Sequence, residues 1–243
     1  MTWSILARDT GGRFGIAIAS RFFAVGSLCA HTRRAVGALS TQALMNPLYG
    51  PKGVAALAQG QSAQEVVDTL IADDSGRAQR QVHILPAVGP AASYTGTECV
   101  AWCGQLQGED FSVAGNMLAG PQVIEATANA YRASVGQPLA ERLLAAMQAG
   151  EQAGGDKRGK QAAALRIQGD EDYLELDLRV DDHIEPLTEL HRLYDKSLER
   201  FQPFVSALAG RHNPVGITDR SEIEARVVQF HAELAARQRA NRP

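Results

Sequence analysis

The chain contains 243 residues, of which 45% are hydrophobic and 21% are charged, and its formal net charge is −3. A chain of this length can bury one sizeable core, and it has no basic block long enough to follow a phosphate backbone. No stretch reaches the roughly 18 consecutive apolar residues of a membrane span, and the N-terminus lacks a signal-peptide pattern. We therefore expect a cytoplasmic protein that binds neither nucleic acid nor a membrane.

Two β-prone runs open the chain. Residues 2–9 and 13–20 are joined by a Thr-Gly-Gly turn and predict a β-hairpin. In the second run, large apolar residues alternate with Gly15, Ala17 and Ala19, so both faces are non-polar. This pattern is typical of a strand that is covered on both sides, with one face that lets another element approach closely.

The remaining predicted elements follow in chain order. They are a strand at 35–42, a loop at 43–51, helices at 53–60 and 62–74, strands at 81–88, 92–96, 100–104 and 111–117, helices at 120–134 and 139–149, strands at 161–168 and 173–180, and a long helix at 185–208. Ser62 and Glu65 form a predicted capping box, and the long helix has an apolar period of three to four residues.

The order of these elements predicts the fold class. Strands occur in hairpins rather than in regular strand-helix-strand units, which favours antiparallel sheets. Strands that are apolar on both faces need a helix layer outside and a second sheet inside. We therefore expect an α+β protein with a four-layer αββα sandwich of two antiparallel sheets. This domain would comprise residues 1–210, and residues 211–243 would form a helical tail that packs on the body or on a second subunit.

Thr2 is the strongest catalytic candidate. A threonine hydroxyl needs a base, and an N-terminal residue carries its own, because an α-amine has a pKa of about 7.7–8.0. The pairing of threonine with its own amine is a known way to activate a nucleophile. Met1 has to be removed first, since an acylated nitrogen is no base. Many proteins begin Met-Thr, so a simple strand start is the alternative.

Two resemblances bear on this hypothesis. Residues 2–21 resemble the start of proteasome-type N-terminal-nucleophile subunits, although Ala19 replaces the acidic residue that precedes Ser-Arg there. Nearly the whole chain up to about residue 195 is similar to the bacterial family called domain of unknown function 1028. The matching stretches include ASRFFAVG at 19–26, STQALMNPLYGPKG at 40–53, VAGNMLAGP at 113–121, GGDKRGKQAAAL at 154–165 and LDLRVDDH at 176–183. This resemblance implies the N-terminal-nucleophile (Ntn) hydrolase fold, with a substrate that is not established.

Several polar residues could complete a site around Thr2. Arg21, at the end of the paired strand, could lower the pKa of the amine or bind a substrate carboxylate, and Gly115-Asn116 could hold an oxyanion. Strand ends, a polar loop and two later segments supply candidate substrate-binding residues: Ser20, Thr41, Gln42, Asn46, Tyr49, Asp156, Arg158 and Asp181. For each one the structural alternative is a cap, a turn or a surface ion pair.

Other patterns do not indicate a cofactor. The segment GGDKRGKQ at 154–161 resembles a phosphate loop, but Gln161 replaces the magnesium-binding hydroxyl and a strand follows where a helix is needed. The RVDDH segment at 179–183 is better explained by a helix cap than by a metal site. Cys29, Cys99 and Cys103 are expected to be reduced thiols. We expect neither a metal nor an organic cofactor.

The sequence thus predicts an amidohydrolase that cleaves a small amide, ureide or cyclic amidine C–N bond with Thr2 as its N-terminal nucleophile. The alternative is a catalytically inactive protein on the same fold that binds a small metabolite, because a fold does not establish a function. A homodimer is the expected assembly.

Overall fold

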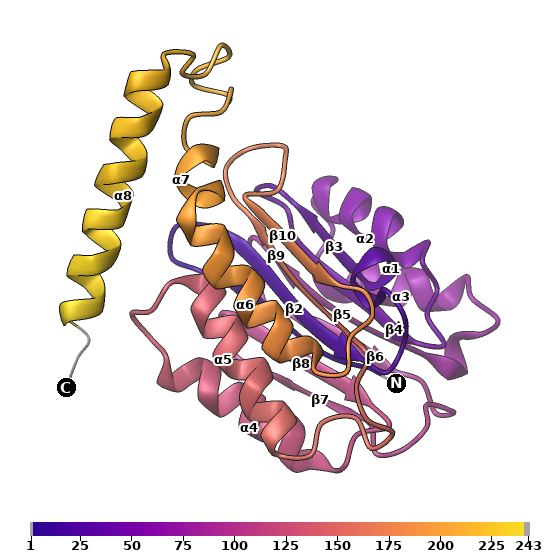
Figure 1. The fold of residues 1–243 in the computed structure, drawn as a ribbon. Coiled ribbons are helices and arrows are strands. Elements are labelled where there is room, and N and C mark those ends of the chain that lie inside the picture. Colours follow the sequence, from indigo (N-terminus) through magenta and orange to yellow (C-terminus); the bar gives the residue numbers. More distant parts are fainter. Residues whose placement is uncertain (1, 241–243) are drawn as a thin grey trace. The chain divides into compact units, whose positions relative to one another are not determined.

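The computed structural model describes residues 2–240 and contains two antiparallel sheets (Figure 1). The larger sheet has the strand order β10-β9-β2-β1-β8-β7 and the smaller one β3-β4-β5-β6. The strands of the larger sheet are β1 (Thr2–Arg8), β2 (Phe14–Ser20), β7 (Gly104–Gln107), β8 (Phe111–Asn116), β9 (Ala162–Gln168) and β10 (Leu176–Val180). Those of the smaller sheet are β3 (Ala30–Arg33), β4 (Gly37–Ala43), β5 (Arg80–Pro86) and β6 (Ala92–Thr95).

Helices cover the outer face of each sheet (Figure 1). The helices α2 (Tyr49–Ala58) and α3 (Ala63–Ala72) pack on the smaller sheet, and α4 (Pro121–Ala133) and α5 (Leu139–Gln152) pack on the larger one. The inner faces of the sheets contact each other through β1, β2 and β8 on one side and β4 and β5 on the other. The predicted four-layer αββα sandwich of the α+β class is therefore confirmed.

The small-residue face of β2 explains how α5 lies so close to the larger sheet. Every residue of β2 is buried. A Cβ atom added at Gly15 would lie 2.3 Å from Cδ1 of Leu143 in α5, so the glycine provides the space that this leucine fills. The close approach that the sequence predicts for this face is confirmed.

The space between the sheets is apolar at one end and polar at the other. Leu6, Ile16 and Leu85 belong to an apolar cluster near the β1–β2 turn. Towards the start of β1, fully buried polar side chains replace them: Ser4, Ser40, Gln42, Gln81, His83, Ser112 and Asn116. Since buried polar groups must be hydrogen-bonded to be tolerated, this second region requires a connected network.

Some elements differ from their sequence predictions. The structure contains a short helix, α1 (Val25–Cys29), a 3-10 turn, η1 (Arg77–Gln79), and the strand β3, none of which shows a clear apolar period. The strand expected at 100–104 lies later, as β7, and α2 begins inside the expected loop at 43–51.

The long helix expected at 185–208 is interrupted. It forms α6 (Pro186–Glu199) and α7 (Phe201–Val205), with Arg200 in a non-helical conformation between them. Pro203 explains the break, because it has no N–H for a bond to the carbonyl of Glu199 and its ring clashes with that carbonyl.

The chain divides into two compact units between Leu190 and His191. All ten strands that the described residues form lie in the first unit. The second contains the end of α6, α7 and α8 (Arg220–Ala240), and within it Arg200 forms an ion pair with Glu224. A domain boundary at residue 210 stays a prediction. Within residues 2–240, the structure has no helix long and apolar enough to cross a membrane.

Candidate active site

Thr2 begins β1 at the centre of the larger sheet. It is paired with Ser20 of β2 on one side and with Asn116 of β8 on the other. Its side chain is on the inner face of the sheet, as is that of Ser4 two residues later. The Thr2 hydroxyl donates to Oγ of Ser20 at 3.1 Å, and the residue is 4% exposed. Met1, whose removal the catalytic hypothesis needs, lies outside the described residues.

Asn116 connects Thr2 to the second sheet. Its Nδ2 donates to Oε1 of Gln81 at 3.0 Å and to the carbonyl oxygen of Thr2 at 3.4 Å. Gln42 also donates to Oε1 of Gln81, at 2.7 Å. Gln42 and Asn116, both predicted site residues, are therefore brought together beside Thr2 by Gln81, which the sequence analysis did not select.

A buried histidine continues this network away from Thr2. Nε2 of His83 lies 2.8 Å from Oγ of Ser4, and its Nδ1 lies 3.0 Å from Oγ of Ser112. Burial lowers the pKa of His83 to about 3, so the imidazole is neutral at physiological pH. Although a serine beside a histidine resembles a nucleophile and its base, all three side chains are fully buried. This group therefore serves the interior rather than a reaction.

One pattern in the sequence indicates the residues of this buried polar network. Buried strands carry polar residues at alternate positions, as in Gln81 and His83 of β5 or Ser40 and Gln42 of β4. Since alternate residues of a strand point to the same face, each run predicts two polar side chains on one inner face. The sequence does not show how the two sheets pack on each other, and this packing brings the polar residues of β4 and β5 against those of β1 and β8.

Arg21, Asp156 and Arg158 meet at the end of β2. The carboxylate of Asp156 accepts hydrogen bonds from the backbone N–H groups of Arg21, at 3.1 Å, and of Arg158, at 2.8 Å. The Arg21 guanidinium donates to the carbonyl of Arg158 at 2.7 Å, and Arg158 forms an ion pair with Asp156 at 3.5 Å. Asp156 is almost completely buried whereas both arginine side chains reach solvent. Three of the predicted site residues thus form one group directly after Ser20.

Gly115 has a packing role that the sequence does not reveal. A Cβ atom at this position would lie 2.5 Å from Cδ1 of Leu118 and 2.9 Å from Cβ of Trp3. Its carbonyl accepts a hydrogen bond from Nε2 of Gln81 at 2.9 Å. The glycine therefore lets Trp3 and Leu118 pack on the helix side of the sheet, while Asn116 faces the inner side.

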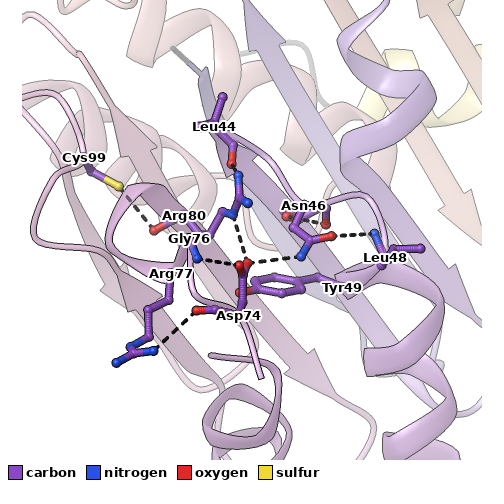
Figure 2. Close-up of polar contacts among 10 residues, drawn as sticks. Leu44, Asn46, Leu48, Tyr49, Asp74, Gly76, Arg77, Arg80 and Cys99 are labelled. Atoms are coloured by element: carbon purple, nitrogen blue, oxygen red, sulfur yellow. Dashed lines mark hydrogen bonds and ion pairs between the residues drawn. The ribbon is translucent and has the colours of Figure 1, made fainter. Parts of the chain in front are cut away.

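Two other predicted site residues, Asn46 and Tyr49, gather elsewhere, around Asp74 (Figure 2). Oδ2 of Asp74 accepts from Nδ2 of Asn46 at 3.1 Å and from the hydroxyl of Tyr49 at 2.8 Å. Thr41 donates to the carbonyl of Asn46 at 3.2 Å. Within the described chain, none of Thr41, Asn46 and Tyr49 has a hydrogen bond to Thr2.

Arg80 completes the Asp74 group (Figure 2). Its Nε donates to Oδ2 of Asp74 at 3.0 Å, and this bond, with those from Asn46, Tyr49 and Gly76, holds the pKa of Asp74 well below its usual range. Burial and the neighbouring carboxylate raise the pKa of Tyr49. Arg80 also donates to the carbonyl of Leu44. The group thus joins the chain after β4 to the chain before β5.

Asp181 has other partners, and in the described part of the chain it makes no hydrogen bond to Thr2. Its carboxylate forms an ion pair with Arg179 at 2.7 Å, and its carbonyl accepts from the N–H of Ala24 at 3.0 Å. No group of three or more possible metal ligands occurs among residues 2–240. At Thr2 the structure presents a hydroxyl pair and a buried amide, and two exposed arginine side chains follow at the end of β2. This set is suited to acyl chemistry on a substrate with an anionic group.

Comparison with known proteins gives the family. A crystal structure of protein SPO2555 from Silicibacter pomeroyi, assigned to DUF1028, is similar with a TM-score of 0.82 and 28% identity, over 90% of this chain and 99% of that one. Anbu (ancestral beta-subunit) from Yersinia bercovieri matches with a TM-score of 0.40 and 13% identity, over 81% of this chain and 94% of that one. No curated protein matches. The model of a family of unknown function, DUF1028, matches residues 2–190, and the chain therefore belongs to the DUF1028 family.

Proposed function

We propose that the protein is an Ntn-type amidohydrolase that cleaves an amide, ureide or cyclic amidine C–N bond of a small molecule. The observation that carries the proposal is the position of Thr2. It begins the central strand of the larger sheet, its hydroxyl lies against Ser20, and Asn116 lies on its other side. This is where an N-terminal threonine would have its own amine and a preorganised amide within reach.

The reaction proceeds through an acyl-enzyme. For an amide or a ureide, after removal of Met1, Oγ1 of Thr2 bonds to the substrate carbonyl carbon, and its proton passes to the α-amine of Thr2. The amine then gives this proton to the leaving nitrogen as the C–N bond breaks. Water next bonds to the ester carbon and gives one proton to the amine. The ester C–O bond breaks, the amine returns the proton to Oγ1, and the acid product leaves.

Asn116 and the arginines have separate roles in this proposal. The hydrogen bond from Asn116 to the Thr2 carbonyl is long, 3.4 Å, so this N–H can turn to the oxyanion, together with backbone N–H groups at Gly115-Asn116. Arg21 lowers the pKa of the Thr2 amine through its positive charge. Arg21 and Arg158 also bind an anionic substrate group, with Asp156 holding them in place. Ser20 orients the Thr2 hydroxyl, and Gln42 shares the Oε1 acceptor of Gln81 with Asn116.

The remaining predicted residues have a weaker case. These residues are Thr41 in β4, Asn46 and Asp181 in loops, and Tyr49 at the start of α2. In this proposal they contribute to substrate binding only by shaping the backbone around them. The proposal requires no cofactor. It also includes a homodimer in the cytoplasm, and light scattering of the purified protein tests the assembly.

The deciding experiment combines intact mass with a panel of small amides and ureides. We expect the purified protein to begin at Thr2 and to turn over at least one compound, with Thr2→Ser keeping part of the rate and Thr2→Ala losing it. Equal turnover by the Thr2→Ala variant would exclude Thr2 as the nucleophile. A functional protein that keeps Met1 and binds a metabolite without turnover would support the alternative, an inactive binding protein on the same fold.

A further inference from the structure

We infer that Gln81 is a positioning residue for this reaction, because it fixes the orientation of the Asn116 amide beside Thr2. The inference rests on the proposed function, which it deepens with a residue on the opposite sheet. Gln81 is fully buried in β5 and accepts a hydrogen bond from Asn116 at 3.0 Å.

The backbone determines which way the Gln81 amide points. Its Nε2 lies 2.9 Å from the carbonyl oxygen of Gly115 and 3.3 Å from that of Gly104. A carbonyl oxygen can only accept a hydrogen bond. If the amide were turned over, its Oε1 would face these two oxygens inside the protein, where unpaired polar groups are costly. Nε2 must therefore point to Gly115, and Oε1 must point to the other side.

This orientation determines that of Asn116. Since Oε1 of Gln81 is an acceptor, Asn116 has to present its NH2 group there, and its Oδ1 points away. Of the two amide hydrogens, one is held by Gln81 at 3.0 Å and the other lies towards the carbonyl of Thr2 at 3.4 Å. The strong bond holds the amide in place while the weak one leaves a donor free to act beside Thr2. Without Gln81, the Asn116 amide can turn over, and neither of its two N–H groups is held in a fixed direction.

The same constraint extends through the buried network. Gln42 also donates to Oε1 of Gln81, so its own Oε1 accepts the hydroxyl proton of Ser4 at 2.8 Å. Oγ of Ser40 also lies 3.3 Å from Oγ of Ser4 and from Oε1 of Gln42, so the hydroxyl protons beyond Gln42 have more than one arrangement. His83 continues the network between Ser4 and Ser112. The hydrogen bond from Gln42 therefore supports Gln81 in the orientation set by Gly115, because it needs an acceptor at the same place as Asn116 does.

A substitution at Gln81 tests the inference with a simple acylating probe. The probe is p-nitrophenyl acetate, and peptide mass mapping measures acetyl transfer to Thr2. We expect Gln81→Met to slow this transfer by about 10- to 100-fold, the scale that misplacement of a catalytic group produces. Gln168→Met is the matched control, because Gln168 is also buried but lies at the other end of β9, opposite Phe14. We expect this control to keep the wild-type rate.

A second variant separates orientation from packing. In Gln81→Glu, a protonated carboxyl can donate to Gly115 and accept from Asn116, whereas an ionised one can only accept. The ratio of its acylation rate to that of the wild type should therefore rise as the pH falls. Taking the ratio removes the protonation of the Thr2 amine, which both proteins share. A ratio that does not change with pH would overturn the inference.

A direct measurement on Asn116 distinguishes the two ways of failing. In the wild type, the side-chain amide of Asn116 should exchange its hydrogens slowly in NMR spectra, and in Gln81→Met it should exchange faster and shift. If these signals are the same in both proteins, or if Thr2 is acylated equally fast in both, Gln81 does not position Asn116. If Thr2 is not acylated in the wild type although the signals change as expected, the proposed function fails while the contact itself is confirmed.

Discussion

The hydroxyl groups of Thr2 and Ser20 are in contact in the candidate site. Replacing Ser20 by alanine removes only one oxygen atom from this contact. The serine oxygen lies 3.1 Å from Oγ1 of Thr2 and holds the hydroxyl at one position. The two residues form the last pair of the β1–β2 hairpin, at its open end, and both are buried. An orienting bond of this kind should affect the chemical step more than substrate binding.

We expect Ser20→Ala to lower kcat about five- to tenfold, because a net hydrogen bond is worth about 1 kcal/mol. KM should stay nearly constant. Steady-state kinetics on a substrate found in the amide panel measure both values. Ser134→Ala, in which the lost hydroxyl bonds to the carbonyl of Tyr131, serves as the control. An unchanged kcat in Ser20→Ala would mean that this contact does not orient the nucleophile.

His83 makes the stability of the protein depend on pH. Burial lowers its pKa to about 3, from 6.5 in the unfolded chain. As the pH falls below 6.5, the unfolded chain takes up a proton that the folded protein does not. The free energy of unfolding therefore decreases, by up to about 1.4 kcal/mol per pH unit, until the folded histidine also titrates near pH 3.

Urea unfolding between pH 7 and pH 4 tests this effect. We expect His83→Gln to be less stable than the wild type at pH 7 but to lose less stability as the pH falls. The carboxylates contribute equally to both proteins, so the difference between the two slopes belongs to His83. Parallel slopes would contradict the prediction.

The sequence was sufficient to select Thr2, Asn116 and the Arg21–Asp156–Arg158 group as neighbours, since they lie at the ends of paired strands or in the loop beside them. It was insufficient for Gln81, Ser4 and His83. Gln81 comes beside Asn116, and Ser4 and His83 join the same buried network, through the packing of one sheet on the other, which no local pattern encodes. For Thr41 the strand was correctly predicted, but alternation along β4 turns its side chain away from that of Gln42.

At the scale of elements, Asp74 joins two segments that would otherwise be loosely held. It binds Asn46 and Tyr49 from the chain after β4, and Arg80 at the start of β5 (Figure 2). The sequence predicted the loop but placed Asn46 and Tyr49 in the substrate site. Their partner Asp74 is the last residue of the helix predicted at 62–74, and no pattern marked it as a partner of the loop.

We expect Asp74→Ala to lower the free energy of unfolding by about 2 kcal/mol, because it leaves several hydrogen bonds to a charged group unmade. Limited proteolysis should then cut between Leu44 and Tyr49, where the wild type resists. Asp73→Ala, which removes the exposed neighbouring carboxylate, is the control for charge. Equal stability of the two variants would show that the Asp74 group does not hold these segments.

At the scale of the whole molecule, the layers could be predicted because burial is periodic. A strand such as β2 that is apolar on both faces requires cover on both sides, and hairpin order requires antiparallel sheets. The break after α6 was missed because the apolar period continues through it, while Pro203 acts on the backbone instead. The division between Leu190 and His191 falls inside this helix.

We expect a chain shortened to residues 1–210 to keep the acylation of Thr2 and the thermal unfolding midpoint of the first unit. The strands all belong to that unit, and the ion pair from Arg200 to Glu224 in α8 lies in the second. Circular dichroism and the p-nitrophenyl acetate assay measure both properties. Loss of acylation in a folded, shortened chain would assign residues 211–243 a part in the site.

Because β1 is paired on both edges, the chain tolerates added residues differently before Thr2 and in the β1–β2 turn. Seven residues of β1 are held in register by β2, and six of them also by β8. Sliding the strand by one position would turn Trp3 towards the other sheet and Ser4 towards the helices. A residue added ahead of Thr2 cannot be absorbed by such a slide. If Thr2 acts as proposed, any tag or leader placed there must be cut off directly before Thr2, whereas the exposed turn at 10–12 has room for added length.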